Sequence, residues 1–474
     1  MIAQTEMLGD MYPLGADSGY DWYRNYNTFS RDFGKASYFA YLPWFTFYKF
    51  IKSCNDVIGS VDFESEATSD EIRGLAGIAY ACRAFDYYML TVLFEPVENI
   101  YTDISQAIDP ESGERLTVPF VTEATDNDMA KRNPRAKHSD MISFILSDLD
   151  KAEAGLSAYT PQSRLFPDLA VVYGLKAKVY LWDEKYDSAA VYARKAIDTF
   201  GGDDKVMTAA EWEDPTSAFA RAAGSWMWYL HYSPENMGNL CNFTGWMSCE
   251  ANWGYAHLTV PGIDKSLYDK IADNDFRKRV FLNPRKYAYY DYKTSQSESF
   301  INGLPDYAAL KFRCLDGNVD DYTVGGAIDV PVMRLEEMLL IEAEALAVSQ
   351  DVEAGRQKLN AFMRTRQPDY ECTFTSLRAF QLEVLTQMRI EFWGEGNAFP
   401  SAKRLKPGVM QNYTGTNAPE EIFLLNCEGI KPNWTLVIPQ YEIDANQVLG
   451  TQNNPDPTLV IETPSPENQY SPAK

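Results

Sequence analysis

Apolar residues recur at steps of three and four along much of this chain, which is the spacing of an amphipathic helix. In the stretch 69–98 these positions are Leu75, Ile78, Ala79, Cys82, Phe85 and Met89. Ser69 or Asp70 can cap the start of this helix, and Pro96 marks its end because proline cannot continue a helix. The preceding stretch, 41–63, has the same character, so the two predict a pair of antiparallel helices.

This periodicity defines four helical blocks along the chain. They cover residues of about 40–98, 135–200, 331–366 and 376–396. In the second block, aromatic and small residues stand where a tetratricopeptide (TPR) repeat places them, at Tyr173, Ala177, Tyr180, Tyr186, Ala189 and Ala196. We therefore expect a mainly α fold in a single domain spanning residues 1–474. About four TPR-like helical hairpins would form a platform.

The pattern changes between about residues 201 and 330, which form a loop-rich insertion between helical blocks. Short alternating runs such as SWMWYLHY, RVFLN and YAALKF are separated there by Gly, Asn and Asp, which predicts short strands and long loops. In the first run we expect Trp226 and Trp228 to share one face and lie in the core. The C-terminal stretch from about 433 to 474 reads as an irregular tail.

Charge and composition narrow the choice of ligand. The net charge of −24 repels phosphate backbones, so nucleic acid is excluded as a partner and a neutral ligand is favoured. No run of about 18 apolar residues occurs. The three histidines and seven cysteines show no metal-ligand spacing, so we predict no metal and no cofactor. Cys241 and Cys249 are close enough for a loop disulfide, or both are free thiols.

Aromatic residues make up 14% of the chain, and four of its ten tryptophans fall between residues 225 and 257. Flat rings in exposed loops stack on the C–H faces of sugars, and neighbouring amides read the hydroxyl groups. Large rings in loops also have fewer structural roles than rings in helices. The candidate ligand-binding residues of this stretch are Tyr229, Trp246, Trp253 and Tyr255. The alternative is that these rings pin a long loop to the helical body.

Four separated stretches resemble the SusD/RagB family of bacterial outer-membrane glycan-binding lipoproteins. They are RAFDYYMLTVLFEPV, PVMRLEEMLLIEAEALA, RIEFWGEGNAFPSAKRL and VIPQYEIDANQVLGTQNNP. The order and spacing of the four stretches carry the resemblance, which extends over residues of about 40–456. The chain departs from the family pattern at Glu95, where glycine is usual, and at 398–401, where an arginine-tryptophan-x-aspartate run is usual.

The resemblance implies a non-catalytic protein on the outer surface of the outer membrane, held by a lipidated N-terminal cysteine. It would capture a neutral oligo- or polysaccharide and deliver it to a SusC-like TonB-dependent transporter. The first cysteine here, Cys54, lies in a predicted helix and cannot be the anchor, so we expect the chain to lack its leader and some mature residues. In this family glycan contacts often come from a loop before the first clear helix. That adds the candidates Tyr20, Trp22, Tyr23 and Asn25.

Two other classes of function compete with this interpretation. A carbohydrate-active enzyme on an α/α scaffold needs two carboxylates facing each other across a cleft. Glu391 and Glu395 lie on one face of a single predicted helix, so we interpret them as ion-pair partners of Arg389 or Lys403. A TPR-type protein-interaction scaffold would need an uninterrupted array of repeats, which the insertion breaks.

The acidic run DGNVDD, residues 316–321, resembles the start of a calcium loop. The distal glutamate of an EF-hand is missing, so a solvated acidic turn is favoured.

Overall fold

The computed structural model describes residues 8–14, 33–419 and 426–460. These residues fall into two compact units, each described separately. Unit 1 contains residues 8–14, 200–402 and 410–419. Unit 2 contains residues 33–199, 403–409 and 426–460.

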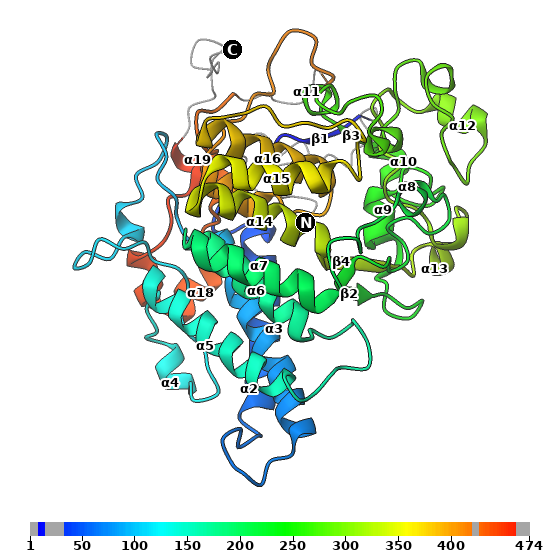
Figure 1. Ribbon diagram of the computed structural model, residues 1–474. Coiled ribbons are helices and arrows are strands. Elements are labelled where there is room, and N and C mark those ends of the chain that lie inside the picture. Colours follow the sequence, from blue (N-terminus) through cyan, green and yellow to red (C-terminus); the bar gives the residue numbers. More distant parts are fainter. Residues whose placement is uncertain (1–7, 15–32, 420–425, 461–474) are drawn as a thin grey trace. The chain divides into compact units, whose positions relative to one another are not determined.

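Unit 2 is built from long helices joined by loops (Figure 1). Its helices are α2 (Tyr38–Ile58), α3 (Asp70–Phe94), α4 (Asn127–Ala130), α5 (His138–Leu156), α6 (Leu169–Trp182), α7 (Tyr186–Phe200), α18 (Gln440–Ala445) and α19 (Pro457–Val460), with 3-10 turns η3 (Ser105–Ala107), η8 (Pro432–Trp434) and η9 (Gln447–Thr451). The Ser69 side chain caps α3 by accepting from the amide of Ile72. The helix ends at Phe94, just before Glu95 and Pro96. The periodicity thus predicted both its start and its end.

Helix α3 packs against α2 on one side and α5 on the other. The approach to α5 is close because Gly155 has no side chain, and a Cβ there would stand 2.4 Å from the carbonyl oxygen of Arg73. A buried guanidinium ties the three helices together. Arg83 on α3 makes two 2.8 Å bonds to Asp148 on α5 and one of 2.7 Å to Asn55 on α2.

Unit 1 combines three longer helices with many short helices and 3-10 turns (Figure 1). Its longer helices are α14 (Leu335–Ser349), α15 (Val352–Met363) and α16 (Leu377–Glu391). Its short elements are α8 (Ala209–Glu213), η4 (Asn239–Cys241), α9 (Phe243–Met247), α10 (Ala256–Thr259), α11 (Lys265–Tyr268), η5 (Phe276–Val280), η6 (Lys286–Ala288), α12 (Glu298–Gly303), η7 (Leu315–Gly317) and α13 (Tyr322–Gly325). Helix α17 (Phe399–Leu405) contributes residues to both units. The expected mainly α fold is confirmed.

Two small antiparallel sheets complete unit 1. Strand β2 (Trp226–His231) pairs with β4 (Asp329–Arg334), and β1 (Met11–Pro13) pairs with β3 (Pro261–Ile263). The other two predicted strand runs were wrong as strands. RVFLN lies partly in the 3-10 turn η5, and beyond it Phe281 forms one isolated bridge with Ala309 of YAALKF.

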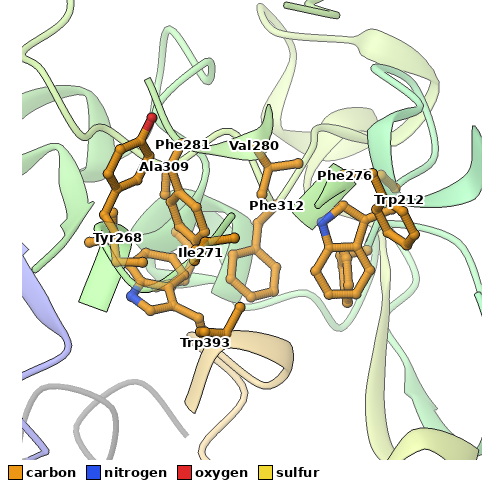
Figure 2. Close-up of a cluster of buried hydrophobic side chains, with 14 of the residues drawn as sticks. Trp212, Tyr268, Ile271, Phe276, Val280, Phe281, Ala309, Phe312 and Trp393 are labelled. Atoms are coloured by element: carbon orange, nitrogen blue, oxygen red, sulfur yellow. The ribbon is translucent and has the colours of Figure 1, made fainter. Parts of the chain in front are cut away.

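The core of unit 1 is rich in aromatic rings, among them Trp212, Phe276, Phe281, Phe312 and Trp393 (Figure 2). Trp226 and Trp228 are buried, as expected. Strict alternation fails beside them, because irregular pairing interrupts the register of β2 and Met227 is buried as well.

The carboxylates of Glu391 and Glu395 are fully buried, and the proposed pairing with Arg389 or Lys403 was wrong. Glu391 accepts from Arg277, Arg334 and Arg366, while Glu395 accepts from Lys311 and Arg334. Glu395 also lies beyond the end of α16 rather than on it. Burial opposes ionisation of Glu391, but the three guanidinium groups outweigh it and hold its pKa far below the ordinary range.

Candidate ligand-binding surface

Three of the predicted rings come together in the loop-rich part of unit 1. Trp246 on α9 stacks on Tyr255 at the start of α10, with ring centroids 4.3 Å apart and 19° between the ring planes. Trp253 meets Tyr322 of α13 edge to face, at 6.2 Å. All four rings are half-buried, so each keeps part of its surface toward solvent. We call these four residues the aromatic surface.

A tight local turn sets the position of these rings. Asn242 caps α9 by accepting from the amide of Gly245 at 2.7 Å, and its amide donates to the carbonyl of Asn239 at 2.6 Å. A Cβ at Gly245 would stand 2.4 Å from the carbonyl oxygen of Leu240 and 3.3 Å from the Trp253 ring. Only glycine therefore lets the Leu240 carbonyl lie this close to the start of α9, beside the Trp253 ring.

Polar groups beside the rings are held in fixed positions. The Asn252 amide donates to Asp320 at 2.6 Å and accepts from Gln296 at 3.0 Å. Behind them, buried Glu250 pairs with Arg313 at 2.7 Å and anchors the loop. Asn252 and Asp320 are exposed, so their remaining lone pairs and N–H groups are available to hydroxyl groups of a ligand.

The indole nitrogen of Trp253 is buried and finds no hydrogen-bond partner among the described residues. The buried indole nitrogen of the core residue Trp212 is in the same state, so this feature does not distinguish Trp253 from a structural ring. The Cys241 thiol lies 3.5 Å from the Tyr255 hydroxyl and is exposed, whereas Cys249 is buried. Both cysteines are free, so the disulfide alternative is wrong.

Five sequence candidates remain. Tyr229 is half-buried on β2, where its ring meets Trp226 edge to face at 6.2 Å and packs on the core. The other four fall outside the described residues, namely Tyr20, Trp22, Tyr23 and Asn25. Sequence reasoning missed Tyr322, although an aromatic ring directly after the acidic run was a usable signal.

The acidic run 316–321 is occupied by contacts within the protein. Asp316 pairs with Arg221 at 2.6 Å, and the Asn318 side chain accepts from the amides of residues 320 and 321. Across the described residues, no group of three potential metal-ligating side chains occurs. The aromatic surface and the polar groups beside it can stack on the flat faces of a ligand and form hydrogen bonds with its hydroxyl groups.

Comparison with known proteins adds the family. Residues 9–181 match a family model described as starch-binding, associating with the outer membrane, and residues 122–455 match the SusD family model. A search of curated proteins finds no match. Within the described part of the chain, no helix is long and apolar enough to cross a membrane.

Solved structures share the fold over nearly the whole chain. A SusD-like carbohydrate-binding protein from Bacteroides vulgatus ATCC 8482 is 21% identical, with a TM-score of 0.73 and coverage of 95% of this chain and 91% of the other. A SusD superfamily protein from Bacteroides thetaiotaomicron VPI-5482 is 20% identical, with a TM-score of 0.70 and coverage of 96% and 94%. Surface glycan-binding protein A from Bacteroides uniformis is 17% identical, with a TM-score of 0.65 and coverage of 96% and 93%. Because the SusD family model matches more than half of its length, the chain belongs to the SusD family, as its motifs predicted.

Proposed function

We propose that this protein is a non-catalytic binder of neutral oligo- or polysaccharides and that the aromatic surface contacts the sugar. The observation that carries the proposal is the stacked pair of Trp246 and Tyr255 beside Trp253 and Tyr322, all half-buried, in the loop-rich part of a SusD-family fold. Because Trp246 and Tyr255 cover one face of each other and Trp246 also packs on the core, the surfaces that the pair leaves exposed would contact a sugar ring.

Each contact of this kind is weak. Covering about 40 Å² of apolar ring surface contributes about 1 kcal/mol. Two or three rings together give about 2–3 kcal/mol, which is less than a millimolar dissociation constant requires. A polymer that offers many equivalent units raises the effective concentration at the surface and offsets this weakness. Binding should therefore grow steeply with chain length.

The buried carboxylates argue against a glycosidase. Catalysis of glycoside hydrolysis uses two carboxyl groups that reach the scissile bond. Glu391 and Glu395 are fully buried and held by arginine and lysine side chains, so neither can contact a glycan. Their role in this protein is to hold the core of unit 1.

We also propose that this protein is lipid-anchored on the outer face of the outer membrane and delivers glycan to a SusC-like TonB-dependent transporter. The family description of starch binding in association with the outer membrane supports this location. Purification of the protein from native outer membranes tests the partnership. Recovery of a β-barrel transporter in stoichiometric amount is expected, and its absence under mild detergent would refute the partnership.

Affinity electrophoresis through gels containing a panel of polysaccharides tests the binding proposal. The wild type is run beside Trp246→Ala, Trp253→Ala, Tyr229→Ala and Trp22→Ala, with Phe166→Ala as an exposed aromatic control in unit 2. We expect one glycan to retard the wild type and the control, and the first two variants to migrate freely.

Three results would contradict the proposal. Retardation that survives in both Trp246→Ala and Trp253→Ala would move the site away from the aromatic surface. Cleavage of the glycan would favour the enzyme. Free migration of the wild type through gels of every polysaccharide would indicate that the rings of the aromatic surface are structural.

A further inference from the structure

A pocket of about 480 Å³ lies in unit 2, between the ends of α3 and α6 and the start of the segment after α17. One part of its wall is apolar, from Val97, Ile104 and Ile108. Another part is cationic, from Arg115, Arg404 and Lys406. A volume of this size is typical of sites for small molecules.

Arg115 forms an ion pair at the pocket wall. Its Nε stands 2.7 Å from Oε1 of Glu95, whose fully buried carboxylate also accepts from the indole N–H of Trp182 at 3.0 Å and bonds His138 at 2.9 Å. The two terminal NH₂ groups of Arg115 make no hydrogen bond to any residue that the structure describes. A guanidinium pinned at Nε with its terminal nitrogens available is a preorganised fork for an oxyanion.

A further guanidinium lies close to the segments that carry Glu95 and Arg115. Arg135 is buried, and its guanidinium bonds only neutral oxygens among the described residues, including the carbonyls of Phe94 and Leu116. A guanidinium without a hydrogen-bonded carboxylate raises the local potential even in a chain of net charge −24.

Two carboxylates, Glu98 and Glu184, also line the pocket, but both residues are exposed. Water screens their charge far more than it screens the buried guanidinium of Arg135. They are also acceptors for hydroxyl groups. The pocket therefore combines a guanidinium fork for an oxyanion, an apolar wall and acceptors for hydroxyl groups. An acidic sugar has the matching groups, namely an oxyanion, a C–H face and hydroxyl groups.

We propose that this pocket binds an acidic sugar unit through its carboxylate or sulfate ester. The oxyanion accepts hydrogen bonds from the terminal nitrogens of Arg115. Arg404 and Lys406 lie on either side of it. The C–H face of the sugar ring lies on the apolar wall. This site lies in unit 2 and is separate from the aromatic surface of unit 1. It stands whether or not the aromatic surface binds neutral glycans.

Isothermal titration calorimetry at 50 mM salt tests the proposal with three probes of matched length. These are an oligogalacturonate, a sulfated galactan oligosaccharide and a neutral galactan oligosaccharide. We expect one or both acidic probes to bind at least ten-fold more tightly than the neutral one. Raising the salt to 200 mM should weaken that binding several-fold. The stronger acidic probe identifies the oxyanion as carboxylate or sulfate ester.

Variants assign the binding to the pocket. Arg115→Lys keeps a charge beside Glu95 but removes the fork, and Arg404→Gln leaves that ion pair untouched; each should weaken the acidic probe at least ten-fold. Arg132→Gln removes an exposed arginine of the same unit and should bind like the wild type. Melting temperatures near that of the wild type confirm that each variant folds.

Equal affinity for neutral and acidic probes, or no acidic binding at millimolar concentration, would overturn the proposal. Unchanged binding in both Arg115→Lys and Arg404→Gln would overturn it too. Trp246→Ala separates this site from the aromatic surface. It should keep acidic binding while losing retardation by neutral glycan, so the two proposals fail independently.

Discussion

Replacing His138 with Gln should change how the stability of unit 2 depends on pH. The imidazole lies between two carboxylates, with Nδ1 at 2.9 Å from Glu95 and Nε2 at 3.0 Å from Asp183. Burial disfavours its protonation, but the hydrogen bonds to Asp183 and Glu95 outweigh that effect and raise the pKa of His138 from 6.5 to about 9. The ring is therefore an imidazolium that donates to both acids at neutral pH.

The magnitude follows from linkage between protonation and folding. A pKa unit corresponds to about 1.4 kcal/mol, so a pKa raised from 6.5 to about 9 stabilises the fold by about 3 kcal/mol at most. Because the folded-state pKa is the higher one, this stabilisation is complete below pH 6.5. It is lost as the pH rises through 9. Burial lowers the pKa of Lys403 to about 7, which gives an opposite slope in the same unit.

Thermal unfolding from pH 6 to pH 9.5 measures the effect as a difference between His138→Gln and the wild type, which cancels the slope from Lys403. For a unit of this size, 3 kcal/mol corresponds to a difference in melting temperature of about 6–12 °C. We expect that difference to be present at pH 6 and nearly gone at pH 9.5. His257→Gln is the control, because His257 is exposed and has no carboxylate partner in the described chain. Parallel curves for His138→Gln and the wild type would refute the reasoning.

Three further predictions concern packing, buried charge and thiol access. Gly155→Ala should lower the melting temperature by several degrees in a calorimetric scan, because the new Cβ would stand 2.4 Å from the carbonyl oxygen of Arg73. Gly303→Ala is the control and should leave the melting temperature unchanged, because a Cβ there has no atom within 4 Å. Arg334→Met should cost about 3–5 kcal/mol in denaturant unfolding, because it leaves buried carboxylates uncompensated; a loss under 1 kcal/mol would contradict this. A thiol reagent should modify Cys241 first, because it is the one exposed cysteine, and a glycan bound to the aromatic surface should slow that reaction. If the glycan that retards the protein in affinity electrophoresis leaves the rate of modification unchanged, the proposed site is contradicted.

The sequence alone determined the long helices, because their period is a property of neighbouring residues. The expected block 40–98 became α2 and α3, and the stop before Pro96 was correct. The order of the motifs also identified the family. A strand is different, because it needs a partner that the local pattern does not name. RVFLN and YAALKF met through one bridge at Phe281 rather than as a ladder.

Only the tertiary structure decided which side chains meet. Glu95 stood out in the sequence only as a departure from a family pattern, yet it forms the buried acceptor for Arg115, His138 and Trp182. Glu391 has partners 57 and 114 residues away rather than on its own helix. Trp246 and Tyr255 were predicted as loop rings, and their stacking depends on the turn at Gly245. Helical period is encoded within a few residues, whereas ion pairs and ring stacks are fixed by contacts between segments that the chain brings together only on folding.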